Sequence, residues 1–142
     1  MVYKDRKIGP LEAKAQKTAG RAFLPRDIDA SILQTLVYEY PKRKINVELS
    51  SDEFTCLCPY SGLPDFARLL IRYTPRRKLI ELKSLKYYLY SYRNVKICNE
   101  HGVNKILEDL VAALKPRTLT IEAEFTSRGG IANRVTANYE KK

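Results

Sequence analysis

Alternating apolar and polar residues mark several segments of the chain as strands. Ile45, Val47 and Leu49 would lie on one side of an extended segment, with Asn46 and Glu48 on the other. Comparable patterns recur later in the chain, and together they predict four strands, over residues 44–51, 66–74, 117–126 and 134–140. The first two strands are expected to pair antiparallel, with the cysteine-containing segment in the connection between them.

Two further segments have the spacing of amphipathic helices. Leu85, Tyr88, Leu89 and Tyr92 recur at intervals of three and four residues, which gathers them on one side of a helix. A second apolar stripe runs over residues 103–114 and ends before a proline. The order strand–strand–helix–helix–strand–strand predicts an α+β domain, an antiparallel sheet with two helices on one face. A lone sheet of this kind leaves its edges open, which favours closure into a ring with copies of itself.

The beginning of the chain lacks a sustained period. Residues 1–30 are polar, rich in Lys and Arg and interrupted by Gly and Pro, so we expect a basic N-terminal arm followed by a domain over residues 31–142. Residues 31–40 fit either a short helix or a strand. No apolar run approaches the ~20 residues of a membrane helix, and the N-terminus carries no hydrophobic segment typical of a secretory signal.

Charge and cysteine content narrow the setting. The 142 residues carry a net charge of +10, with basic runs such as 42–44 and 76–78. Such a surface attracts polyanions, either nucleic acid or phosphorylated small molecules, although a solvated face that keeps the protein dissolved explains the charge equally well. The chain has three cysteines, an odd number, and does not depend on disulfides for its core, so we expect reduced thiols and a cytoplasmic location.

Cys58 and Asp65 are candidates for chemistry. Cys58 precedes a proline in a basic chain, where a nearby cation would lower its pKa and expose a thiolate nucleophile; the alternative is a small buried hydrophobe. Asp65 stands where a strand begins, so partial burial would raise its pKa and make it a proton donor; the alternative is a carboxylate that caps a turn. A rival interpretation takes Cys56, Cys58, Cys98 and His101 as zinc ligands.

Other polar side chains favour ligand binding. Lys83 and Lys86 are three residues apart near an expected helix start, where two ammonium groups could hold a phosphate, or simply face solvent. Glu100 precedes the second helix, where it could accept two N–H bonds from a guanine-like edge or complement the helix dipole. Arg128 stands before two glycines in a turn that either approaches a ligand or only closes a hairpin.

Four motifs, taken together, resemble one family. The segments are FTCLCPYSGLPDF, ELKSLKYYLYSYRN, NEHGVNKILEDL and FTSRGGI, within residues 54–131. They resemble the NADPH-dependent 7-cyano-7-deazaguanine reductases of queuosine biosynthesis, in their short single-module form. Residues 81–88, ELKSLKYY, satisfy every position of that family's pattern E-[SL]-K-[SA]-x-K-[LY]-[YFW]. The resemblance implies the tunnelling fold, reduction of a nitrile to an aminomethyl group, and a role in tRNA modification.

The resemblance also implies residue roles. Cys58 would be the nucleophile that forms a thioimide, and Asp65 would be the general acid. Glu100, Glu81 and Ser84 would bind the substrate, and the phosphates of NADPH would lie on Lys83, Lys86 and Arg128. No metal has a role. Asn99 departs from the histidine or tyrosine that some relatives have before the glutamate.

The resemblance extends to assembly. Family members stack two rings with active sites between neighbouring subunits, so we expect a ring-forming homo-oligomer, in the form of a homodecamer. Nucleic acid is a possible but not a required partner. Two alternatives stay open, an archaeosine-type amidinotransferase relative that acts on nitrile-bearing tRNA, and a non-catalytic RNA-binding module. The basic charge favours the former, and the intact ELKSLKYY segment opposes it.

Overall fold

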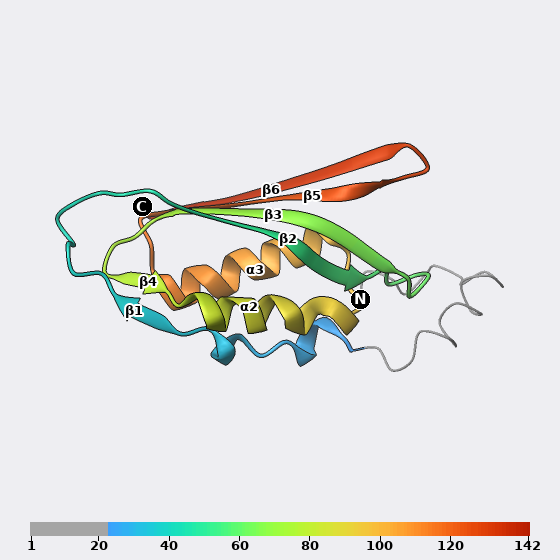
Figure 1. The fold of residues 1–142 in the computed structure, drawn as a ribbon, viewed down its shortest axis with the longest axis horizontal. Coiled ribbons are helices and arrows are strands. Elements are labelled where there is room, and N and C mark those ends of the chain that lie inside the picture. Colours follow the sequence, from blue (N-terminus) through green and yellow to red (C-terminus); the bar gives the residue numbers. More distant parts are fainter. Residues whose placement is uncertain (1–22) are drawn as a thin grey trace.

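The structure is a computed structural model that describes residues 23–142 (Figure 1). The first part of the predicted basic arm, residues 1–22, therefore lies outside the described residues. The described elements are, in chain order, the 3₁₀ turns η1 (Pro25–Asp27) and η2 (Ala30–Ile32), β1 (Thr35–Val37), β2 (Val47–Leu57), β3 (Pro64–Thr74), β4 (Lys78–Ile80), α2 (Leu82–Tyr90), η3 (Ser91–Asn94), α3 (Asn99–Leu114), β5 (Thr118–Arg128) and β6 (Ile131–Glu140).

The four long strands form one antiparallel sheet, in the order β2-β3-β5-β6. Helices α2 and α3 cover the same face of this sheet (Figure 1). Every second residue of the two central strands faces the helices, and this set is fully or almost fully buried, namely Ala67, Leu69, Ile71 and Tyr73 from β3 and Leu119, Ile121, Ala123 and Phe125 from β5. The predicted α+β class, the antiparallel sheet and the helices on one face are confirmed.

The opposite face of the sheet carries polar and charged side chains. Arg72 of β3 donates to Glu48 of β2 over 2.9 Å, and Arg134 of β6 lies 3.3 Å from Glu124 of β5. Arg68 pairs with Asp52 over 3.3 Å. Exposed pairs of this kind stabilise the fold by at most about 1 kcal/mol each. They leave the arginines of this face with acidic partners.

Two three-residue strands form a second sheet that the sequence pattern did not reveal. β1 pairs antiparallel with β4, with Thr35 opposite Ile80 and Val37 opposite Lys78. Segments this short contain too few alternations for a period to be recognised. The ambiguous segment 31–40 thus contains a 3₁₀ turn and a strand. Gln34 of this segment ties it to the start of α2, because its N–H donates to the Ser84 hydroxyl and its carbonyl accepts from the Glu81 N–H. The start of α2 in turn lies beside the end of β3, because the Ile80 N–H donates to the Tyr73 hydroxyl over 3.1 Å.

Strand β2 is longer than the pattern indicated. Its register with β3 shifts between Ser51 and Phe54, and this irregularity interrupts the simple alternation at residues 52–53. Pairing then resumes and reaches Leu57 opposite Pro64. The expectation that both cysteines lie in the connection is wrong for Cys56, which is a strand residue paired with Asp65. Only Cys58 belongs to the turn.

The described end of the predicted arm packs against the domain. Ile28 belongs to the hydrophobic core and is 8% exposed. The Phe23 N–H donates to the carbonyl of Asn94, and the Lys96 N–H donates to the carbonyl of Phe23. Residues 23–30 therefore form part of the folded unit in the structure. Among the described residues no helix has the length and apolar character needed to cross a bilayer.

Candidate active site

Cys58 stands in the tight turn that joins β2 to β3. Its N–H donates to the carbonyl of Leu63 over 2.8 Å, and its carbonyl accepts from the N–H of Gly62 over 2.9 Å. Gly62 has φ 73°, a conformation that a residue without a Cβ adopts at little cost. The two hydrogen bonds hold the cysteine backbone, so the side chain is presented from a closed loop at the end of the sheet.

The two neighbouring cysteines have opposite properties. Burial raises the pKa of Cys56 to about 12, and this side chain is 1% exposed. Burial also raises the pKa of Cys58, but hydrogen bonds from the N–H and hydroxyl of Ser61 and from the N–H of Tyr60 outweigh it, so the net pKa is below the ordinary value. A thiolate is the reactive form of cysteine, which identifies Cys58 as the candidate nucleophile and Cys56 as a core residue.

Asp65 lies on the same side of the sheet as these cysteines. It is the register partner of Cys56, and it shares the helix-covered face with Ala67 and Leu69 of its own strand. Burial raises the pKa of this carboxyl, and the guanidinium of Arg128 offsets part of the increase. Asp65 therefore keeps its proton to a higher pH than an exposed aspartate, as a general acid requires.

Arg128 is the residue that anchors Asp65. It ends β5, before Gly129 and Gly130, whose φ angles of 55° and 77° suit the turn to β6. One of its guanidinium nitrogens ion-pairs with the Asp65 carboxylate and also donates to the Pro64 carbonyl over 2.7 Å. The structure thus places Arg128 beside Asp65 and away from the start of α2, where the resemblance grouped it with the two lysines.

Glu100 joins the same end of the sheet through the segment before α3. The end of β2 pairs in parallel with this segment, because the Leu57 N–H donates to the Val95 carbonyl and the Ile97 N–H donates to the Leu57 carbonyl. Hydrogen bonds from its own backbone N–H and from the Cys98 thiol lower the pKa of Glu100. Its carboxylate accepts from Cys98 over 3.2 Å and from the Asn133 amide over 3.5 Å. Glu100 is consequently ionised and oriented.

Three residues near Glu100 were not foreseen in these roles. Cys98 and Asn133 orient the carboxylate, and Asn133 comes from β6, more than thirty positions away, so no local motif could indicate it. Asn99 has a side-chain oxygen that is buried and accepts no hydrogen bond from any described residue. This oxygen is a buried acceptor without a described partner, next to Glu100 in the chain.

Glu81 and Ser84, the other residues assigned to substrate, hold the start of α2. The Glu81 carboxylate accepts from the N–H groups of Lys83 and Ser84 over 2.9 and 2.7 Å, and these bonds lower its pKa. The buried Ser84 hydroxyl accepts from the Gln34 N–H over 2.9 Å. Both residues have partners within the chain, so a role in substrate binding stays a prediction.

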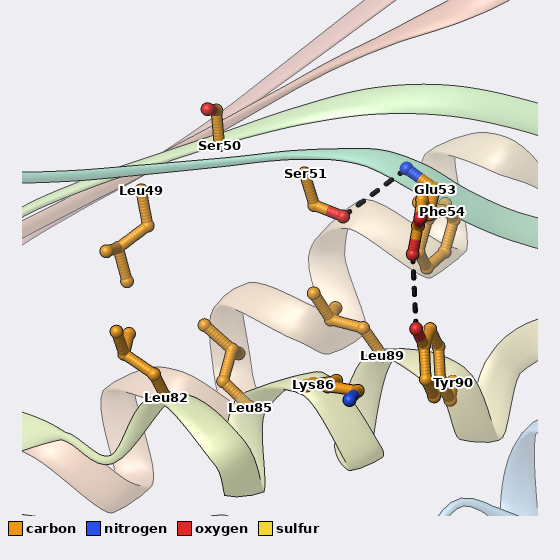
Figure 2. A pocket seen from close by; sticks show the side chains of 10 residues that line it. All are labelled: Leu49, Ser50, Ser51, Glu53, Phe54, Leu82, Leu85, Lys86, Leu89 and Tyr90. Atoms are coloured by element: carbon orange, nitrogen blue, oxygen red, sulfur yellow. Dashed lines mark hydrogen bonds between the residues drawn. The ribbon is translucent and has the colours of Figure 1, made fainter.

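Lys83 and Lys86 are exposed and form no ion pair with a described residue. The first N–H groups of α2 already bind the Glu81 carboxylate, so the ammonium groups, rather than the helix N-terminus, remain available to a phosphate. Lys86 lies 5.8 Å from the ring centres of Tyr87 and Tyr90. It borders a groove of about 470 Å³ between β2 and α2, which Figure 2 shows with Leu49, Phe54 and Leu82 among its apolar lining residues.

The start of α2 lies toward the end of the sheet opposite the β2–β3 turn (Figure 1). Asp65 is near the start of β3, whereas Tyr73, beside the start of α2, is near its end. These residues are eight positions apart, which corresponds to about 27 Å along a strand. One chain therefore brings together Cys58, Asp65, Arg128 and Glu100, but keeps the start of α2, with Glu81, Lys83 and Ser84, apart from them. Lys86, further along α2, borders the groove that reaches Phe54 of β2.

The zinc interpretation finds no support in the geometry. Within residues 23–142, no three His, Cys, Asp or Glu side chains are arranged to hold a metal ion. Cys98 directs its thiol to Glu100.

The comparisons with known proteins identify the family. Residues 64–142 match the sequence profile of the family described as QueF-like protein. The chain belongs to this family. A relative from Caldanaerobacter subterraneus subsp. tengcongensis is 56% identical over 115 residues, which cover 81% of this chain and 86% of the relative. A relative from Caldicellulosiruptor bescii is 54% identical over 80% of this chain and 87% of its own length. Both are named NADPH-dependent 7-cyano-7-deazaguanine reductase.

A solved structure supports the architecture of this QueF-like chain. The archaeosine synthase QueF-Like in its apo form aligns with a TM-score of 0.61, covering 70% of this chain and 95% of its own. The two sequences are 21% identical, so this likeness shows the fold alone.

Proposed function

We propose that this protein reduces the nitrile of 7-cyano-7-deazaguanine to the 7-aminomethyl group, with NADPH, in the cytoplasmic biosynthesis of queuosine. The observation that carries the proposal is the pairing at the end of the sheet, where Cys58 has a lowered pKa and the buried Asp65 has a raised one. The names of relatives that are 43–56% identical over most of the chain support the same reaction.

The first step uses this pair directly. The Cys58 thiolate adds to the nitrile carbon, one C–N π bond breaks, and the nitrogen takes the proton of Asp65 to give a neutral thioimide on sulfur. Asp65 becomes a carboxylate, which the Arg128 guanidinium stabilises through the existing ion pair. The step needs both a thiolate and a carboxylic acid, and burial of Asp65 supplies the acid.

Glu100 would orient the substrate in the site. Its lowered pKa keeps the carboxylate ionised, so it can accept two N–H bonds from the pyrimidine edge of a deazaguanine. Asn133 and Cys98 fix the carboxylate before the substrate arrives, which reduces the entropy lost on binding.

The lysines of α2 suit a dinucleotide phosphate. Lys83 and Lys86 are exposed cations without acidic partners in the described chain, and the groove beside Lys86 has an apolar lining that could take a planar ring. When bound, NADPH supplies hydride, and two equivalents account for reduction of a nitrile to an amine. The task of the lysines is to hold its phosphates.

The separation within one chain supports an active site shared between subunits. The start of α2, which carries Lys83, lies near the end of β3 that is about 27 Å along the strand from Asp65, so a neighbouring copy could supply the lysines to the Cys58 site. We infer a tunnelling fold closed into rings, in which the open edges of β2 and β6 pair between copies, and a homodecamer of two rings.

Incubation with free 7-cyano-7-deazaguanine tests the proposed function. With NADPH present, we expect NADPH absorbance to fall and the aminomethyl product to appear. Without NADPH, intact-protein mass spectrometry is expected to show one added substrate mass. If NADPH is not consumed and ammonia is transferred to nitrile-bearing tRNA instead, the amidinotransferase alternative replaces the reductase.

A mixing experiment tests the shared site. The double variant Lys83→Ala/Lys86→Ala is expected to raise the KM for NADPH more than that for the nitrile, because only the phosphate contacts are lost. Co-expression of this double variant with Cys58→Ala is expected to restore activity, because each variant supplies the half of the site that the other lacks. With equal amounts of the two subunits, roughly a quarter of the sites in mixed rings would combine two intact halves.

Cys58→Ala mixed with Asp65→Asn is the matched control for this experiment. Both substitutions fall in the same half of the site, so mixed rings should regain nothing. Mixed assemblies of the first pair that contain both subunits and remain inactive would mean that each chain completes its own site.

A further inference from the structure

The end of the sheet opposite Cys58 gathers basic residues from four separate segments. The β1–β2 loop, the β3–β4 turn, the α3–β5 connection and the C-terminus all meet there (Figure 1). Backbone contacts fix the arrangement, because Tyr38 donates to Arg77, Arg117 donates to Thr74 and Lys141 donates to Arg117. We call this surface the basic end, and it consists of Lys42, Arg43, Lys44, Arg76, Arg77, Lys78, Lys115, Arg117, Lys141 and Lys142.

The charge of the basic end is not neutralised within the described chain. All of its members except the half-buried Arg117 are exposed, and none forms an ion pair with a described residue. Only Glu39 and Glu140 lie in the same segments. The arginines on the open sheet face, in contrast, each have a carboxylate partner. The excess charge is therefore concentrated at one place instead of being spread as a solvated coat.

An exposed aromatic residue stands within this surface. Tyr40 is 62% exposed, and the Arg43 guanidinium lies 5.7 Å from its ring centre. The two border a hollow of about 530 Å³ together with Glu39, Pro41 and Lys42. The Arg117 guanidinium donates to the Pro41 carbonyl over 3.4 Å and so holds the β1–β2 loop against the α3–β5 connection. A ring and a cation on the surface offer one base a stacking partner and its phosphate a counter-charge.

We propose that the basic end binds a single-stranded segment of nucleic acid, such as an RNA loop, through its phosphates and one base stacked on Tyr40. The number of unpaired cations exceeds what a dinucleotide would neutralise, and their spread over four segments suits a phosphate backbone. Like charges on every copy disfavour burial of this end against a second copy of itself. The inference does not depend on the proposed function, since it uses none of the residues assigned to catalysis.

Salt-dependent binding of labelled nucleic acids to the full-length protein tests the proposal. The probes are an RNA hairpin with an unpaired loop, single-stranded DNA with the loop sequence, and a DNA duplex. Lys42→Ala/Arg43→Ala is expected to weaken binding to both single-stranded probes about tenfold and to reduce the slope of log K against log salt by about 0.7 per lost contact. Tyr40→Ala is expected to weaken those two probes about tenfold and to leave duplex binding unchanged.

The matched control is Arg26→Ala/Arg93→Ala, which removes the same charge from exposed positions outside the basic end. Retained binding in this variant supports the proposal, and the better of the two single-stranded probes identifies the source of the ligand. If both double variants lose the same amount of binding affinity, the effect comes from net charge alone and the proposal is overturned. It is also overturned if Tyr40→Ala changes nothing, if Lys42→Ala/Arg43→Ala alters only the KM for NADPH, or if that variant changes only the oligomeric mass.

Discussion

Replacing Cys58 with alanine is expected to abolish both the covalent adduct and the reduction, with a loss of turnover above about 10⁴-fold. The reason is that neither of the other two thiols is placed to replace it. Cys56 is sealed in the core with a pKa raised to about 12, and Cys98 directs its thiol to Glu100. Intact-protein mass spectrometry after incubation with the nitrile, without NADPH, measures the adduct directly.

Cys56→Ala is the control for this experiment. It removes the adjacent thiol from the same strand end, so it should keep the adduct and cost the fold only about 1 kcal/mol of stability. Thermal unfolding of both variants separates loss of chemistry from loss of structure. An adduct that persists in Cys58→Ala and disappears in Cys56→Ala would exchange the roles of the two cysteines.

The sequence predicted the fold well where its elements are long. The alternation in residues 117–126 gives β5 almost to the residue, because all four of its apolar positions face the helices. The stripe over residues 103–114 gives α3, but its first turn was missed, since Asn99 and Glu100 carry no apolar signal. Residues 31–40 were left open between helix and strand, and β4 and its pairing with β1 were missed, because this pairing depends on tertiary contact and not on a local pattern.

The candidate site could be predicted only in part. Cys58, Asp65, Glu100 and Arg128 came from motifs, and the structure brings all four to one end of the sheet. Their mutual roles did not follow from sequence, because the pairing of Arg128 with Asp65 depends on β5 lying beside β3. Proximity along a motif was also misleading for Glu81 and Lys83. Both residues lie at the start of α2, at the end of the sheet opposite the β2–β3 turn.

Replacing Asp65 with asparagine is expected to slow adduct formation by about 10²–10⁴-fold. Asparagine keeps the shape and the hydrogen-bonding edge of the side chain, but it has no acidic proton to give to the nitrile nitrogen. The hydrogen bond from the Arg128 guanidinium to the Pro64 carbonyl does not involve the substituted side chain and keeps the end of β5 in place, so the fold should be retained. Stopped-flow mixing with the nitrile, followed by quenching and mass analysis, gives the rate.

The pH dependence makes this test sharper. The reactive form holds a thiolate on Cys58 and a proton on Asp65 at once. The lowered pKa of the thiol and the raised pKa of the carboxyl bring the two values toward each other, and each unit of approach enlarges the reactive fraction tenfold. The wild-type rate should therefore fall on both the acid and the alkaline side of a pH optimum. The apparent pKa values of these two limbs belong to the Cys58–Asp65 pair and not to either residue alone.

In Asp65→Asn the alkaline limb should vanish, because no carboxylic acid remains to be deprotonated. The rate should rise with pH as the thiolate forms and then stay level. The thiol should also ionise at lower pH than in the wild type, since the negative charge of Asp65 raises the pKa of Cys58. Alkylation of Cys58 by iodoacetamide across pH measures this second shift independently of the nitrile. A variant that keeps the alkaline limb has its proton donor elsewhere, and the assignment of Asp65 as general acid would then be wrong.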